Sequence, residues 1–124
     1  MYDHGLQEVF NMEKKIAVLS DATGAPTTLP QAESVIVYAR RESGWQQISS
    51  FSCMDFGTDT QHDLRILSEA IADELGEIKV ILGSDISGAP YSALNWVGFM
   101  ICESEAISDE FFDDLFDELE ADEE

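Results

Sequence analysis

Short segments rich in apolar and β-branched residues predict five strands along this chain. Residues 15–20 (KIAVLS) and 78–83 (IKVILG) are almost continuously apolar, as expected of strands buried on both faces of a sheet. The remaining predicted strands are residues 34–39, 45–53 and 99–102. The turn at residues 41–44 joins the second strand to the third, so these two strands form a hairpin.

Apolar residues spaced three and four positions apart predict three helices. The first helix begins after Asp59 and Thr60, either of which can cap its N-terminus, and ends at Gly76. One face of this helix carries four aliphatic side chains, which are Leu64, Leu67, Ile71 and Leu75. A second, short helix follows residues 87–90, and the side chains expected to point inward from it are Tyr91, Leu94 and Val97.

The last predicted helix is amphipathic and strongly acidic. It begins after Ser108, and its apolar stripe consists of Phe111, Phe112, Leu115, Phe116 and Leu119. All the remaining residues between positions 109 and 120 are Asp or Glu. Such a helix packs its stripe either on its own sheet or in a groove of a partner. Packing on its own sheet is the simpler expectation, and the acidic face stays available to a partner.

The order of these elements, β-β-β-α-β-α-β-α, indicates the fold class. A meander followed by two right-handed crossovers gives a five-stranded mixed sheet with strand order 3-2-1-4-5. This arrangement predicts an α/β, ribonuclease-H-like domain of three layers that ends in the acidic amphipathic helix. We expect an N-terminal extension at residues 1–13, one domain at residues 14–119 and an acidic tail at residues 120–124.

The charge of the chain restricts its partners. Its 26 acidic and 6 basic side chains give a net charge of −20, and residues 103–124 alone contain 12 acidic side chains. Binding to a phosphate backbone or to an anionic membrane needs clustered Lys and Arg, so nucleic acid and membrane surfaces are excluded as partners. A basic protein surface or a metal-bearing partner can approach the chain more easily.

Targeting signals and cysteine usage indicate a cellular compartment. No apolar run approaches the roughly 20 residues that cross a bilayer. The N-terminus lacks the basic-then-apolar order of a secretory signal. The two cysteines show no CxxC spacing and are interpreted as free thiols. We therefore expect a soluble cytoplasmic protein.

The loop at residues 83–91 is the first candidate site. It joins a buried strand to the N-terminus of a helix, where free N–H groups and the helix dipole favour an anion. Ligands of open α/β sheets bind at the carboxyl ends of the strands, and this places Asp21 at the same edge. The predicted cofactor-binding residues are Asp21, Ser84, Asp85, Ser87, Gly88 and Tyr91. The competing interpretation is a tight strand-to-helix turn whose serines cap the helix.

A metal site is the second candidate. The topology brings Cys53 and Cys102 to the carboxyl ends of strands, and His62 follows near the start of a helix. Thiolate and imidazole ligands suit iron–sulfur and similar centres. Against this, the three residues lie far apart in the sequence without a metal-ligand spacing. A buried cysteine and a capping or surface histidine are the competing interpretations.

Enzyme motifs are missing from the sequence. The central apolar strands contain no internal carboxylate of the kind that a two-metal nuclease needs. No GxSxG elbow and no cysteine-protease signature occurs. We therefore expect a binding or accessory protein and not an enzyme, with hydrolase activity left open.

Three parts of the sequence carry a family resemblance. At KKIAVLSD, at ELGEIKVILGSDISGAPYSALNWVGFMICE and in the acidic tail, the chain resembles the AnfO family of iron-only nitrogenase accessory proteins. The resemblance implies a protein that assists nitrogenase maturation or function by binding its subunits, its cofactor-assembly proteins or, transiently, its iron–sulfur cofactor. The alternative is a regulatory domain that binds a small molecule or an anion at residues 83–91. The oligomeric state stays open.

Overall fold

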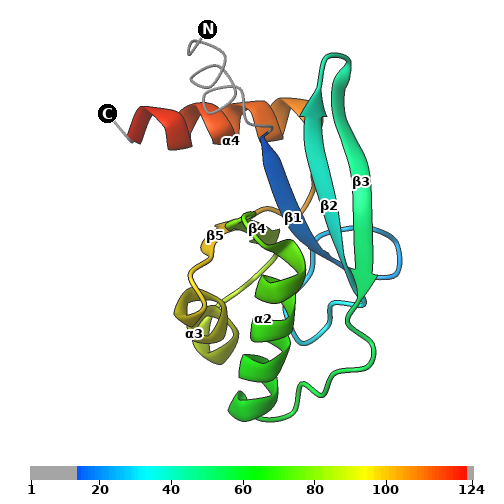
Figure 1. Ribbon diagram of the computed structural model, residues 1–124, viewed down its shortest axis with the longest axis vertical. Coiled ribbons are helices and arrows are strands. Elements are labelled where there is room, and N and C mark those ends of the chain that lie inside the picture. The colour runs from blue at the N-terminus through cyan, green and yellow to red at the C-terminus, as the bar shows by residue number, and fades with distance from the viewer. Residues whose placement is uncertain (1–13, 123–124) are drawn as a thin grey trace, which may run out of the picture.

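The structure is a computed structural model that describes residues 14–122 (Figure 1). The predicted N-terminal extension, residues 1–13, lies outside the described residues. Residues 123 and 124 of the predicted acidic tail also lie outside them.

Five strands form one mixed sheet with the order β3-β2-β1-β4-β5. The strands are β1 (Lys15–Ser20), β2 (Ser34–Arg41), β3 (Gly44–Ser52), β4 (Val80–Gly83) and β5 (Met100–Glu103). Strand β1 pairs antiparallel with β2 and parallel with β4, and β4 pairs parallel with β5. The predicted α/β class and the predicted strand order are therefore confirmed.

Helices cover both faces of this sheet and create two apolar clusters. Helices α2 (Gln61–Leu75) and α3 (Gly88–Trp96) lie side by side on one face, where they pack on Ala17 and Leu19 of β1. Helix α4 (Asp109–Asp122) packs on the other face, against Ile16 and Val18. Because β1 alternates between the two clusters, its apolar run is buried on both sides, as the sequence predicts.

The start of α2 is capped by Thr60, one of the two predicted caps. The hydroxyl of Thr60 accepts a hydrogen bond from the backbone N–H of Asp63 at 3.0 Å, which satisfies one of the free N–H groups of the first turn. Gly76 ends the helix with a positive φ of 59°.

Helix α3 corrects one sequence prediction. Tyr91 was expected to point inward, but its side chain is 46% exposed. The inward face of this two-turn helix consists of Ala93 and Leu94, with Val97 packed beside them. Tyr91 falls on the flank of that face, so the core reaches α3 through smaller side chains than predicted.

Helix α4 docks on its own sheet through aromatic and polar contacts. The ring of Phe112 is 2% exposed and lies 4.9 Å from the ring of Trp45 and 5.6 Å from that of Tyr38, between ring centroids. A carboxylate oxygen of Asp113 accepts hydrogen bonds from the indole N–H of Trp45 at 2.9 Å and from Nε of Arg40 at 3.1 Å. These contacts hold the start of α4 beside the β2–β3 hairpin.

The hairpin turn is shaped to accept α4. The backbone N–H of Trp45 donates to Oδ2 of Asp109 at 3.2 Å. Gly44 has a φ of 125°, and a Cβ built on it would collide with that same carboxylate. Only glycine therefore permits both the turn and the close approach of the helix.

Candidate functional site

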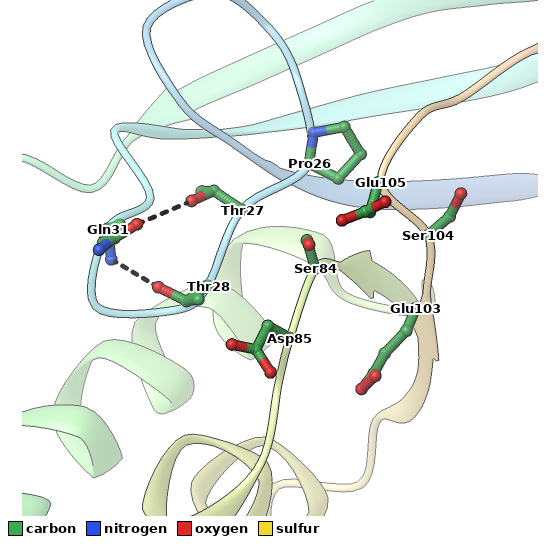
Figure 2. A pocket seen from close by; sticks show the side chains of 9 residues that line it. All are labelled: Pro26, Thr27, Thr28, Gln31, Ser84, Asp85, Glu103, Ser104 and Glu105. Atoms are coloured by element: carbon green, nitrogen blue, oxygen red, sulfur yellow. Dashed lines mark hydrogen bonds between the residues drawn. The ribbon is translucent and has the colours of Figure 1, made fainter.

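An open hollow of about 600 Å³ lies at the carboxyl ends of the parallel strands (Figure 2). Three segments line it: the loop after β1, the loop after β4, and the end of β5 with the two residues that follow. Its lining residues are Pro26, Thr27, Thr28, Gln31, Ser84, Asp85, Glu103, Ser104 and Glu105. The hollow occupies the edge of the sheet at which open α/β folds bind ligands.

Backbone hydrogen bonds join the three segments. The N–H of Ser84 donates to the carbonyl of Thr27 at 3.0 Å, and the N–H of Ser104 donates to that of Gly83, also at 3.0 Å. A Cβ on Gly83 would lie 2.8 Å from the Thr27 carbonyl oxygen and 2.5 Å from Cδ1 of Ile86. Glycine at this position therefore lets the loops close tightly around the hollow.

The chemistry of the hollow is acidic and hydroxylic. Three carboxylates line it, from Asp85, Glu103 and Glu105, together with serine and threonine hydroxyls, and its lining contains no Lys, Arg or His. The N-terminus of α3 contributes about half a positive charge, which is small beside three carboxylates. The negative charge dominates, so the hollow favours a cationic or hydroxyl-rich molecule and opposes an anion.

The loop after β1 supplies the neutral side of the hollow. The Thr27 hydroxyl lies 3.4 Å from Oε1 of Gln31, and the backbone N–H of Gln31 donates to the Thr28 hydroxyl at 3.2 Å (Figure 2). Sequence reasoning missed these residues, and it also missed Glu105. Their signal was topological, because each lies in a segment that follows or adjoins a parallel strand at the same edge of the sheet.

The predicted cofactor-binding residues separate into two groups. Ser84 and Asp85 line the hollow, and Asp85 has a left-handed backbone with a φ of 54°. Ser87, Gly88 and Tyr91 lie on the exposed start of α3 and do not line the hollow. A ligand-binding role for any of them stays a prediction.

Asp21 also stays apart from the hollow, because its carboxylate binds its own turn. Oδ1 of Asp21 accepts the N–H of Thr23 at 2.8 Å, the hydroxyl of Thr23 at 2.7 Å and the N–H of Ala25 at 3.1 Å. The hydrogen bonds from Thr23, followed by the one from Ala25, lower the pKa of Asp21. The carboxylate therefore stabilises the loop that leads to Thr27.

The structure does not bring the predicted metal ligands together. Cys53 packs in the cluster under α2 and α3, whereas Cys102 packs in the cluster under α4, on the other face of the sheet. Cys53 follows β3 and Cys102 lies on β5, and these are the two outermost strands. Four strand spacings of about 4.8 Å separate them by about 19 Å. His62 is exposed in the first turn of α2.

Burial also makes both thiols poor ligands in this conformation. It raises the pKa of Cys53 to about 11. It raises the pKa of Cys102 as well, with a further contribution from the negative charge of Glu118. Within residues 14–122, no group of three or more His, Cys, Asp or Glu side chains is placed to hold a metal ion. A metal role for Cys53, His62 or Cys102 stays a prediction.

Among the described residues, no helix has the length and apolar character needed to cross a membrane.

Known proteins resemble this chain to different degrees. A solved structure described as the crystal structure of PH0822 is similar, with a TM-score of 0.45 and 9% identity over 73% of this chain and 78% of that chain. Similarity at this level supports no functional conclusion. No curated protein matches the chain.

A family model described as iron-only nitrogenase protein AnfO matches residues 15–124. The match begins at the first residue of β1 and includes the whole sheet and helices α2, α3 and α4. The family resemblance read from the sequence is confirmed. The chain belongs to the AnfO family of iron-only nitrogenase proteins.

Proposed function

We propose that this protein is a cytoplasmic accessory protein of the iron-only nitrogenase system that acts by binding nitrogenase subunits or the proteins that assemble their cofactor. The observation that carries the proposal is the family match over residues 15–124, because it relates nearly the whole chain to an iron-only nitrogenase protein. The proposal includes a ribonuclease-H-like fold for the domain, which the strand order supports. It does not include nuclease activity.

Binding of a protein is favoured over holding of the iron–sulfur cofactor. A cofactor carrier needs ligands that converge on the cluster, and thiolates are the usual ones. Here Cys53 and Cys102 lie on opposite faces of the sheet, and burial raises the pKa of both thiols. Docking on a subunit does not need such converging ligands.

The charge of the protein supports a basic partner surface. A net charge of −20 accelerates association with a positively charged surface and makes that association sensitive to salt. The exposed carboxylates of α4 include Asp114, Asp117 and Glu118.

The test is a binding measurement under strict anaerobiosis. The full chain is mixed with each purified nitrogenase component, in its apo form and its cofactor-loaded form, and separately with isolated iron–iron cofactor. Gel filtration and interferometry should show a complex with at least one protein component that weakens as salt is raised. If a complex forms only with the isolated cofactor, the protein carries the cofactor and does not act by binding subunits. If no complex forms with the cofactor or with any nitrogenase component, the proposal is refuted.

A small-molecule regulatory domain is the second candidate function, because the hollow that contains Ser84 and Asp85 has the volume of a metabolite site. Its three carboxylates favour polyamines or other cations and polyhydroxylated compounds over phosphates. A thermal shift panel tests this, since a ligand at 100 times its Kd adds about 2.7 kcal/mol of stability. If a compound shifts the unfolding temperature of the native chain and of Asp85→Asn equally, that compound binds outside the hollow.

A further inference from the structure

Helix α3 is an uncharged surface element in a highly charged protein. The chain has 32 charged side chains among 124 residues, the sum of 26 acidic and 6 basic ones. Residues 86–102 contain none of them over 17 consecutive positions, and α3 lies entirely within this run. An interior helix would explain the composition, but α3 lies at the surface of the sheet, beside α2 (Figure 1).

The exposed face of α3 carries two large aromatic side chains. Trp96 is 59% exposed and Tyr91 is 46% exposed. Five residues at 100° each place them about 140° apart around the helix and about 7.5 Å apart along it. The exposed residues between them include Ser92 and Asn95, which are small and polar. A flat partner surface could contact only one of the two rings, whereas a groove that receives the helix contacts both.

A contact with α2 restrains the side chain of Trp96. The guanidinium carbon of Arg65 lies 5.4 Å from the centroid of the Trp96 ring, within the range of a cation–π interaction. An exposed tryptophan that is already held in place loses less conformational entropy on binding. This is the residue type most enriched among the dominant contacts of protein interfaces.

Carboxylates lie near the start of the uncharged helix and on α2 beside it, whereas Arg65 contacts its end at Trp96. Asp85 precedes it, and Glu103 ends the strand that follows it. Glu69 lies one helical turn after Arg65, so it occupies the side of α2 that faces α3. A matching partner surface has an apolar floor for the two rings and Lys or Arg on its rim. A second copy of this chain fails this requirement, because its own rim is acidic.

We propose that α3 is the docking element of this protein, with Tyr91 and Trp96 inserted into an apolar groove of a partner protein whose rim carries Lys and Arg. The inference rests on the proposed function and specifies the surface through which it operates.

The test compares three variants of the full chain with the native protein. Trp96→Ala and Tyr91→Ala remove the proposed anchors. Ile48→Ala is the matched control, because Ile48 is a 39% exposed apolar residue on β3, at the opposite edge of the sheet from α3 and β5. All three side chains are exposed, so circular dichroism and thermal unfolding should be close to those of the native protein.

Binding to the purified iron-only nitrogenase components is measured for each variant by interferometry. We expect Trp96→Ala to weaken the complex at least thirtyfold, the effect of an interface hot spot, and Tyr91→Ala to weaken it at least tenfold. Ile48→Ala should bind within twofold of the native protein. Native-like binding by both α3 variants would overturn the docking surface and leave the proposed function standing. No binding by the native protein would overturn both.

The self-association alternative has its own measurement. Sedimentation of the native protein alone should give a monomer at micromolar concentration. A dimer that Trp96→Ala dissociates would show that α3 binds a second copy, and it would overturn the basic partner groove.

Discussion

Removing the Phe112 side chain should release α4 from the sheet. In the Phe112→Ala variant the cluster beneath α4 loses a ring that is 2% exposed and contacts Tyr38 and Trp45. Truncation of a buried phenylalanine to alanine costs about 3–5 kcal/mol. We expect the upper part of this range, because the ring also makes aromatic pairs that are worth about 0.5–1.5 kcal/mol each beyond their buried area. Domains of this size have only about 5–15 kcal/mol of stability.

Urea denaturation followed by circular dichroism and by tryptophan fluorescence measures the change. Trp45 lies in the affected cluster, so its emission should shift to longer wavelength in the variant before the rest of the domain unfolds. Asp114→Ala is the control on the same helix, since Asp114 is exposed, and it should change stability by less than about 1 kcal/mol. A loss below about 1 kcal/mol for Phe112→Ala, with unchanged emission, would show that α4 does not depend on this cluster.

Two further substitutions and one labelling experiment test separate features of the fold. The hydrogen bond from the indole N–H of Trp45, together with Arg40, lowers the pKa of Asp113. The stability that this carboxylate contributes is therefore complete above its unfolded pKa and is lost as the pH falls through its folded pKa. The difference in stability between the native chain and Asp113→Asn should disappear on acidification, and a constant difference would contradict the assignment. Cys53, with its pKa raised to about 11, should resist a thiol reagent at pH 8 until urea unfolds the chain, and rapid labelling of the native protein would show that its core opens. Thr60→Ala should cost about 1 kcal/mol in urea denaturation and Thr60→Ser much less, so an unchanged midpoint for Thr60→Ala would refute the cap.

The sheet could be predicted because local patterns determine it. The apolar run of β1 requires burial on both faces, and this makes β1 the central strand. The hairpin turn then places β3 beside β2, and right-handed crossovers place β4 and β5 on the other side. Element ends were less predictable. Residue 78 was expected in β4, but its N–H bonds to the carbonyl of Leu75 and so completes the turn after α2.

The candidate site was only partly predictable, because its outline depends on contacts between distant segments. The position of Ser84 and Asp85 after a parallel strand was enough to find them. The position of Asp21 was equally suggestive, but its carboxylate is engaged by its own turn, which strand order does not reveal. The positions of the two thiols were predictable only as far as the end of the sheet. The strand order places them at one end of the sheet, but side-chain alternation sends them to opposite faces.

The net charge and the two aromatic side chains should affect different rate constants of the proposed complex. The net charge of −20 acts over long range and sets the encounter rate with a basic surface, whereas Tyr91 and Trp96 act only after contact. Raising the salt concentration should therefore lower the association rate of the native protein and leave its dissociation rate nearly unchanged. Trp96→Ala should do the reverse and accelerate dissociation, because most interface truncations act on that rate. If Trp96→Ala instead slowed association and left dissociation unchanged, Trp96 would guide the encounter, and the groove contact would have to be assigned to other residues.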